Sequence, residues 1–358
     1  MAQNPIPPGR RPGRAAASND AGRFERLARS PFDDGWGAEE LPPLRTQVTE
    51  ERPRAAIARN DSPDVPFARS LNPYRGCEHG CVYCFARPTH AWLGLSPGLD
   101  FETRLVARPG IAAVLEREMG RPGYVPEPLA IGTNTDPYQP IERDRRVFRA
   151  VLEALAAWHH PVTITTKGTL IERDLDLLGP MAAEGLAAVG VTVTTLDAGL
   201  ARAMEPRVPA PARRLLAVRR LAEAGVPVRV MVAPVVPALA DHELERILEA
   251  GAEAGATAAS MTVLRLSLEV APLFRDWLEE RVPLRAARVM ARVRELHGGR
   301  DYDPAWGTRM TGQGEWARLL RQRFVLARRR LGLDRPAPPL RTDLFARPPR
   351  PGDQLRLL

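Results

Sequence analysis

Short apolar runs alternate with longer amphipathic runs through most of the chain, and this rhythm restricts the possible folds more than any other feature. Runs rich in Val, Ile and Thr predict strands at Phe67–Asn72, Leu129–Thr133, Val162–Thr166, Ala188–Thr194, Val226–Val232 and Thr257–Leu264. Amphipathic runs predict helices at about Ile111–Met119, Arg145–Trp158, Glu172–Glu184, Ala212–Ala224, Ala240–Ala254 and Leu284–Leu296. Such alternation indicates an α/β domain with a parallel sheet and right-handed crossovers. Six units are too few for a closed eight-stranded barrel, which leaves a partial barrel or an open doubly wound sheet.

The segments on either side of this alternating region differ from it in composition. Residues 1–65 are rich in Pro, Arg, Gly and Ala without sustained periodicity, so we expect a mostly flexible extension. Residues 66–298 form the predicted core domain. Residues 299–358 are expected to form an appendage with a Gly-containing loop, an Arg-rich helix and a Pro-rich end.

The positive charge of the chain is concentrated in its last segment. The formal net charge is +8, and residues 318–358 alone contain eleven Arg against three Asp. Such a tail can bind phosphates, or it can be a solvated helix face with an extended end, and both interpretations stay open. No apolar run approaches the ~18 residues of a membrane span. The N-terminal residues lack the apolar region of a secretory signal, so a cytoplasmic protein without a membrane partner is expected.

Polar side chains follow the predicted strands, at the edge where parallel α/β folds place their ligand sites. The second strand is followed by the run from Thr133 to Glu142, and the fourth is followed by Asp197, Glu205 and Arg207. The third strand ends at Lys167, which is the single lysine among 51 basic residues. A compact ammonium and a planar guanidinium are not interchangeable at a binding site, which makes Lys167 a candidate ligand-binding residue.

All three cysteines of the chain lie within the short segment from Cys77 to Cys84. Thiolates clustered this closely are typical of a soft metal centre. Zinc is one candidate, with His79 or His90 as the fourth ligand. An iron–sulfur cubane is the other, and three thiolates would leave one of its irons open to a substrate or cofactor.

The spacing Cys77-x3-Cys81-x2-Cys84, with Tyr83 before the last cysteine, resembles the signature of the radical S-adenosylmethionine enzymes. The wider sequence "SLNPYRGCEHGCVYCFAR", with "TTLD…EPR" and "MVAPVVP" downstream, is similar to the DNA repair photolyase-like branch related to spore photoproduct lyase. The resemblance covers about residues 67–266. It implies a partial (β/α)6 barrel similar to a TIM barrel, with a [4Fe–4S] cluster held by Cys77, Cys81 and Cys84.

The same resemblance implies S-adenosylmethionine as the second cofactor. The reduced cluster would cleave it to a 5′-deoxyadenosyl radical that abstracts hydrogen from a substrate, and Tyr83 would pack near the adenine. Further positions match the family's contacts to S-adenosylmethionine: Thr133, Asn134 and Asp136 for the methionine amino group, Lys167 and Arg207 for its carboxylate, and Thr194 and Thr195 for the ribose. A reductant protein of the flavodoxin or ferredoxin type is the expected partner.

Two departures from spore photoproduct lyase argue against the lyase reaction itself. No cysteine is left as a hydrogen donor, and Phe85 stands where that enzyme carries a tyrosine. Nucleic acid is one candidate substrate, and a protein or a small molecule is another. The alternative to a radical enzyme is a non-catalytic iron–sulfur or zinc-binding module that binds nucleic acid.

Overall fold

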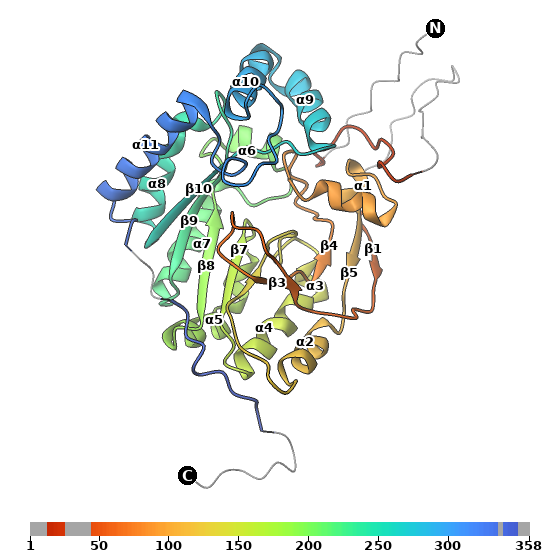
Figure 1. Cartoon of the computed structure of the whole chain (residues 1–358), viewed down its shortest axis with the longest axis vertical. Coiled ribbons are helices and arrows are strands. Elements are labelled where there is room, and N and C mark those ends of the chain that lie inside the picture. The colour runs from red at the N-terminus through yellow and green to blue at the C-terminus, as the bar shows by residue number, and fades with distance from the viewer. Residues whose placement is uncertain (1–12, 26–43, 336–338, 350–358) are drawn as a thin grey trace.

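Six parallel strands form the centre of the fold (Figure 1). The computed structural model describes residues 13–25, 44–335 and 339–349. Each of these six strands pairs with the one of the six that follows it in the chain. In order, they are β3 (Arg69–Leu71), β6 (Leu129–Ile131), β7 (Val162–Thr166), β8 (Ala187–Thr192), β9 (Val228–Val235) and β10 (Ala258–Val263). A doubly wound sheet reverses its strand order in the middle, and this sheet does not. The predicted partial (β/α)6 barrel is therefore confirmed.

Two smaller additions extend this architecture. The short strand β2 (Ala58–Arg59) pairs antiparallel with β3 at the edge of the main sheet. A separate three-stranded sheet has the order β1-β5-β4, with β1 (Gln47–Glu50), β5 (Arg104–Ala107) and β4 (Tyr74–Arg75). Both β1 and β2 lie within residues 1–65, so part of the predicted extension pairs with strands of the core.

Helices cover the outer side of the main sheet (Figure 1). The predicted ones there are α2 (Ile111–Met119), α4 (Val147–Ala157), α5 (Leu175–Ala183), α7 (Pro211–Glu223) and α8 (Leu244–Glu253). The sixth predicted helix, α10 (Pro283–Leu296), lies at the top of the view, away from the sheet. The predicted runs containing α5 and α8 begin as the 3-10 helices η2 (Thr169–Asp174) and η3 (Asp241–Glu243). Within the described residues, no helix has both the length and the hydropathy needed to cross a membrane.

Several helical elements were not expected from the sequence. They are η1 (Arg87–Leu93), α1 (Leu99–Thr103), α3 (Glu142–Arg145), α6 (Ala198–Met204) and α9 (Val270–Arg281). Most of them are too short to show the apolar repeat of a helix. The longest of them, α9, has Pro272 in its first turn. Proline is tolerated there, but in a sequence it usually indicates that a helix ends.

The main core lies between the sheet and the helices. Val162 and Ile164 of β7 are buried in one cluster with Leu152 and Leu155 of α4. Each such side chain contributes about 1.5–3 kcal/mol relative to leaving it exposed. Along β7 these buried side chains alternate with partly exposed threonines, and β9 is likewise buried mainly on one face. The Val- and Ile-rich runs therefore located the strands through the apolar face that packs on the helices.

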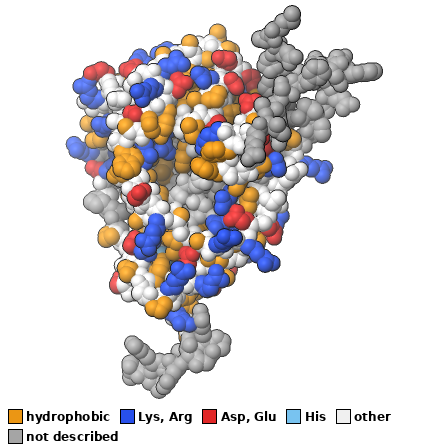
Figure 2. Space-filling model, turned by 45° about the vertical axis from the view of Figure 1, so that its right-hand side comes forward, with side chains coloured by type: hydrophobic (Ala, Val, Ile, Leu, Met, Phe, Trp, Pro, Cys, Tyr) orange, Lys and Arg blue, Asp and Glu red, His pale blue; other side chains and the backbone are white. Residues whose placement is uncertain are grey.

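The Arg-rich helix of the appendage packs on the barrel. It is α11 (Gly314–Arg330), and it lies beside α8 (Figure 1). Leu320 and Phe324 join the main core, Arg323 pairs with Glu245, and Arg330 pairs with Glu249. Basic and acidic side chains are interspersed over the face of the molecule in Figure 2. These contacts favour the solvated-face interpretation for this helix, while residues 350–358 lie outside the described chain.

A buried ion pair anchors the segment that carries the cysteines. The Arg87 guanidinium lies 2.5 Å from a Glu102 carboxylate oxygen, and both side chains are fully buried. Arg87 also donates to the carbonyl oxygens of Gly80 and Cys81 at 3.0 and 2.9 Å, which belong to the cysteine loop. The Glu102 carboxylate oxygens also accept backbone N–H groups of residues 15 and 16. One pair thus joins the cysteine loop, α1 and the N-terminal segment.

We predict that Arg87→Met lowers the free energy of unfolding of the iron-free protein by about 3–5 kcal/mol, because it leaves the Glu102 carboxylate buried without its cation. Urea unfolding followed by circular dichroism measures the change. Arg143→Met is the matched control, since the Arg143–Asp144 pair is at the surface with side chains 76% and 75% exposed. Equal unfolding midpoints for the two variants would contradict the anchoring role.

Candidate active site

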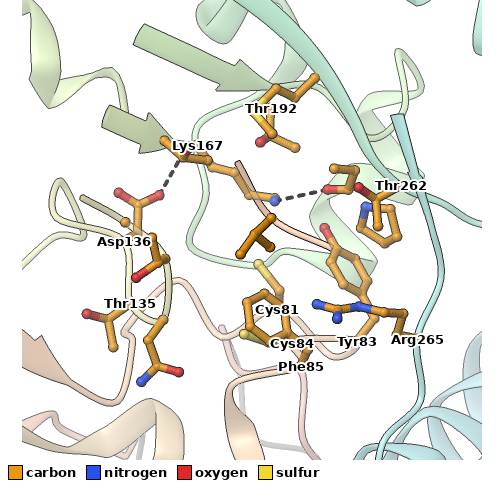
Figure 3. Close-up of a pocket in the computed structure, with 18 of the residues that line it drawn as sticks. Cys81, Tyr83, Cys84, Phe85, Thr135, Asp136, Lys167, Thr192, Thr262 and Arg265 are labelled. Atoms are coloured by element: carbon orange, nitrogen blue, oxygen red, sulfur yellow. Dashed lines mark hydrogen bonds between the residues drawn. The ribbon is translucent and has the colours of Figure 1, made fainter. Parts of the chain in front are cut away.

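The carboxyl ends of the strands open into a cavity of about 530 Å³ (Figure 3). Its walls come from the cysteine loop and from residues at or after the ends of β6, β7, β8, β9 and β10. Two further segments, from outside the region of resemblance, complete the wall: Asn60, Ser62 and Val65 on the N-terminal side, and Arg309 and Met310 on the C-terminal side. A backbone hydrogen bond from Val263 to Met310 holds the second segment against β10. Both predicted flanking regions therefore contribute to the site.

All three cysteines line this cavity as free thiols. Cys77 and Cys81 are buried, and Cys84 is partly exposed. Burial raises the pKa of the Cys77 thiol, and the neighbouring Asp136 raises it further. Burial likewise raises the pKa of Cys81, with Glu205 adding to the effect. Thiolates at these positions need compensating positive charge, which a bound metal centre supplies. The donor set therefore fits a thiolate-ligated centre.

The two histidines considered as a fourth ligand make other contacts. His79 Nδ1 lies 3.3 Å from a carboxylate oxygen of Asp136, and His90 Nε2 lies 2.9 Å from the Arg104 carbonyl oxygen. Within the described part of the chain, no three His, Cys, Asp or Glu side chains are arranged around the position of one ion. A cubane takes each thiolate on a different iron and does not need such convergence. Both histidines are thus engaged with groups other than the three thiols.

The backbone of the cysteine loop requires glycine at Gly80. Its φ is +65°, in the left-handed region that favours glycine. A Cβ placed there would lie 2.6 Å from Glu102 Oε2, the oxygen that also accepts the Ala15 N–H. The turn between Cys77 and Cys81 can therefore pass this close to Glu102 only without a side chain.

The loop after β6 is held by hydrogen bonds to its own neighbours. Asn72 Oδ1 accepts the Asn134 N–H at 3.0 Å, and its amide donates to the Thr133 hydroxyl at 3.1 Å. Asp136 accepts the Lys167 N–H at 2.7 Å and the Thr166 hydroxyl at 2.6 Å. Thr133, Asn134 and Asp136 all line the cavity as expected, but the Asp136 carboxylate is already engaged.

The charge state of Asp136 follows from these contacts. Burial alone would raise the pKa of Asp136. His79, the Lys167 N–H and the Thr166 hydroxyl outweigh burial and hold that pKa below its usual value. The carboxylate is therefore ionised at neutral pH, and it ties the cysteine loop to the end of β7.

Lys167 extends across the cavity from the end of β7 (Figure 3). Its ammonium group lies 3.4 Å from the Ala233 carbonyl oxygen and 5.8 Å from the centroid of the Tyr83 ring. Among the described residues, no carboxylate oxygen lies within 4.0 Å of it. The predicted placement of the only lysine at the mouth of the barrel is thus what the structure shows.

The ring of Tyr83 lines the cavity, while its hydroxyl points into a buried network. That hydroxyl donates to Glu205, which also accepts the Thr194 hydroxyl at 2.7 Å and pairs with Arg214 at 2.7 Å. Burial alone would raise the pKa of Glu205, but Arg214 and Lys167 outweigh it and lower that pKa. The ionised Glu205 carboxylate thus fixes the Tyr83 hydroxyl through a hydrogen bond.

Thr194 and Thr195 do not reach the cavity. The Thr194 hydroxyl is bound by Glu205, and the Thr195 hydroxyl donates to Glu243. The strand β8 ends at Thr192, two residues before the predicted end. Thr192 lines the cavity, in contrast to Thr194 and Thr195. The hydroxyls expected to contact a ribose are therefore engaged elsewhere.

Arg207 is also placed differently from the expectation. Its guanidinium pairs with Glu78 at 2.8 Å, and it is not among the residues that line the cavity. Glu78 follows Cys77 in the loop, and neither Glu78 nor Arg207 lines the cavity. Arg207 therefore supports the loop rather than offering a cation to a ligand.

Arg265 and Phe85 line the cavity, although the sequence pattern assigned neither of them to a ligand. Arg265 follows β10, and its guanidinium lies over the Phe85 ring (Figure 3). The position just after the last predicted strand was the available signal for Arg265. In a chain with almost no lysine, however, one more arginine is not conspicuous.

We predict that Gly80→Ala destabilises the protein more than Gly94→Ala does. Gly94 has nearly the same φ, +66°, but no atom of the described residues lies within 4 Å of the point where a Cβ would stand. Gly94→Ala should cost only about 1–2 kcal/mol for the left-handed backbone. Gly80→Ala should cost about 1–3 kcal/mol more, because its Cβ overlaps the Glu102 carboxylate. Urea unfolding of both variants checks this, and equal costs would contradict it.

Comparison with known proteins places this geometry in a family. A model of the radical SAM superfamily matches residues 71–251. An uncharacterized protein of Mycobacterium tuberculosis is 38% identical over 319 residues, covering 88% of this chain and 87% of the relative. An uncharacterized protein of Methanocaldococcus jannaschii is 26% identical over 180 residues, covering 50% of this chain and 65% of the relative.

Solved structures share the fold at low sequence identity. Spore photoproduct lyase complexed with dinucleoside spore photoproduct aligns with a TM-score of 0.57 and 17% identity, covering 79% of each chain. A variant of that enzyme with bound AdoMet and dinucleoside spore photoproduct aligns with a TM-score of 0.57 and 15% identity, also over 79% of each chain. The segment matched by the family contains the three cysteines and the barrel strands from β6 to β9. The chain belongs to the radical SAM superfamily.

Proposed function

We propose that Cys77, Cys81 and Cys84 hold a [4Fe–4S] cluster and that the adjoining cavity binds S-adenosylmethionine. The observation that carries this proposal is the set of three free thiols from one loop, lining a single cavity at the carboxyl ends of the strands. When bound and reduced, the cluster supplies an electron that cleaves S-adenosylmethionine to a 5′-deoxyadenosyl radical, which abstracts hydrogen from the substrate. Radical SAM enzymes generally need a reductant, and we propose a flavodoxin or ferredoxin type of protein for this role.

The residues of this chain orient the cofactor and exclude water from it. Lys167 offers its ammonium to the methionine carboxylate, because it points into the cavity without a carboxylate partner among the described residues. Thr133 and Asn134 line the side of the cavity assigned to the methionine amino group. The Tyr83 ring offers a flat apolar face for the adenine, and its hydroxyl bond to Glu205 fixes that ring.

For the second substrate we propose a nucleic acid. Support comes from spore photoproduct lyase, which shares the fold and is described in complex with a dinucleoside. The cavity also has more cationic than anionic side chains in its wall, as a phosphate-bearing substrate requires. The lyase reaction itself is not proposed, because all three cysteines are cluster ligands and none is left as a hydrogen donor.

We predict that changing any one of Cys77, Cys81 or Cys84 to Ala removes most of the bound iron, because each thiolate holds one iron of the cluster. Iron analysis and the visible absorbance of anaerobically prepared protein measure this loss, and the cleavage of S-adenosylmethionine should fall with it. As a control, each variant is unfolded in urea beside the iron-free parent to show that the fold persists. Full iron content together with undiminished cleavage in any variant would refute the assignment.

A separate prediction concerns Lys167. Lys167→Ala should keep the iron but weaken S-adenosylmethionine binding by about 2–4 kcal/mol, the range for losing one partner of a buried charged pair. Lys167→Arg should also be impaired, because a planar fork cannot replace a compact ammonium. Equilibrium dialysis with labelled S-adenosylmethionine gives both affinities.

Arg207→Gln is the control for this experiment. It removes a cation that pairs with Glu78 and does not line the cavity. Once unchanged iron content shows that the cysteine loop is intact, the affinity for S-adenosylmethionine should stay within about twofold of the parent. Lys167 would not be the carboxylate partner if Lys167→Arg bound S-adenosylmethionine as tightly as the parent. The same would follow if Arg207→Gln lost more affinity for S-adenosylmethionine than Lys167→Ala.

A further inference from the structure

Arg265 is a cavity cation without an acidic partner in the described part of the chain. It lines the cavity just beyond β10, and its side chain is half-buried. Across the ranges 13–25, 44–335 and 339–349, its guanidinium makes no ion pair within 4.0 Å and no hydrogen bond. The guanidinium lies over the Phe85 ring, whose centroid is 4.6 Å from Arg265 Cζ (Figure 3). All five donors of the guanidinium are therefore available to a ligand.

The other charged groups of the cavity wall do not neutralise Arg265. Apart from His79, they are Lys167, Arg309 and Asp136. Asp136 is bound by the backbone of Lys167 and by Thr166, and Arg309 pairs with Asp64. Burial lowers the pKa of Arg265, and it outweighs the opposite effects of Tyr302, Cys84 and Asp64. An anion bound beside Arg265 would offset this effect of burial.

Lys167 and Arg265 stand at different strand ends, β7 and β10. S-adenosylmethionine carries a single carboxylate, and the proposed function assigns that carboxylate to Lys167. An anion bound at Arg265 would therefore come from the other substrate. Arg265 is the cation left to bind it.

Phe85 adds a second recognition element next to Arg265. Its side chain is 47% exposed, which is high for a phenylalanine at the wall of a cavity. A guanidinium that binds phosphate next to an aromatic face that stacks a base is the combination by which proteins bind single-stranded nucleic acid. An acidic peptide would use the guanidinium but has no base to stack on the ring.

We propose that Arg265 and Phe85 form the substrate subsite of this enzyme. Arg265 binds a phosphate oxygen of a single-stranded nucleic acid, and Phe85 stacks on the neighbouring base. The role of this subsite rests on the proposed radical function. Binding of nucleic acid to it can nevertheless be measured without turnover.

The test uses fluorescein-labelled hexathymidylate and the anaerobically purified, unreduced holoenzyme with S-adenosylmethionine, followed by fluorescence anisotropy at several salt concentrations. Arg265→Gln should weaken binding about tenfold or more, as expected for a hydrogen bond to a charged group. It should also reduce the slope of log K against log salt by about 0.7, the value for one phosphate contact on a single strand. Phe85→Leu should weaken binding without changing that slope.

Arg219→Gln is the matched control, because it removes one exposed arginine of α7 on the outside of the barrel. It should bind hexathymidylate within about twofold of the parent, as for other isolated surface charges. Arg265→Lys should retain the salt slope but not the full affinity, and it replaces Arg265→Gln if the latter does not fold. Iron content and urea unfolding verify each variant.

Four results would overturn the subsite, and the last of them would also overturn the nucleic-acid substrate. The first is equal binding by Arg265→Gln and Arg219→Gln. The second is a loss of S-adenosylmethionine affinity in Arg265→Gln with unchanged hexathymidylate binding. The third is tighter, Arg265-dependent binding of fluorescein-labelled hexaglutamate, which would assign the site to an acidic peptide.

A parent that cleaves S-adenosylmethionine but does not bind hexathymidylate would overturn the subsite and the nucleic-acid substrate, leaving the radical function intact. Arg265-dependent binding by a parent that cannot cleave S-adenosylmethionine would overturn the radical function alone.

Discussion

The buried Arg87–Glu102 ion pair is the interaction on which the arrangement of the cysteines depends. Its guanidinium binds carbonyl oxygens of the loop between Cys77 and Cys84, and its carboxylate binds the backbone of the N-terminal segment. Two charges removed from water are stable only when their remaining hydrogen-bonding positions are filled. Here backbone groups of the loop fill them, so the loop cannot change shape without exposing a buried charge.

A second set of contacts connects this loop to the barrel. The Glu78 N–H donates to Gln139 after β6, His79 pairs with Asp136, and the Tyr83 hydroxyl donates to Glu205 after β8. These contacts fix the position of the thiols relative to the strand ends. Preorganisation of this kind means that the free energy of binding is not used to order the loop. The carboxylate in the cavity wall is engaged in the same contacts, which leaves the wall's cations to attract a ligand.

The sequence alone predicted the elements whose signals are local. Runs rich in Val, Ile and Thr located the strands because each strand buries an apolar face against the core. The spacing of Cys77, Cys81 and Cys84 indicated a thiolate-ligated centre because one short loop carries all three. Lys167 could be placed at the mouth of the barrel because it directly follows the β7 run. The short helices were missed, since fewer than two turns carry too little periodicity.

Only the tertiary structure decided which polar groups stay available to a ligand. Thr194 and Arg207 were candidates because of their positions after a strand. In the structure the Thr194 hydroxyl is hydrogen-bonded to Glu205, and the Arg207 guanidinium is paired with Glu78 of the cysteine loop. Arg265 looks like many other arginines in the sequence, and only the fold leaves it in the cavity wall without a carboxylate from the described residues. The composition and spacing of the sequence thus determined the barrel, the thiol cluster and the position of the lysine. The free or engaged state of each side chain depends on long-range pairing, and a local pattern does not contain that information.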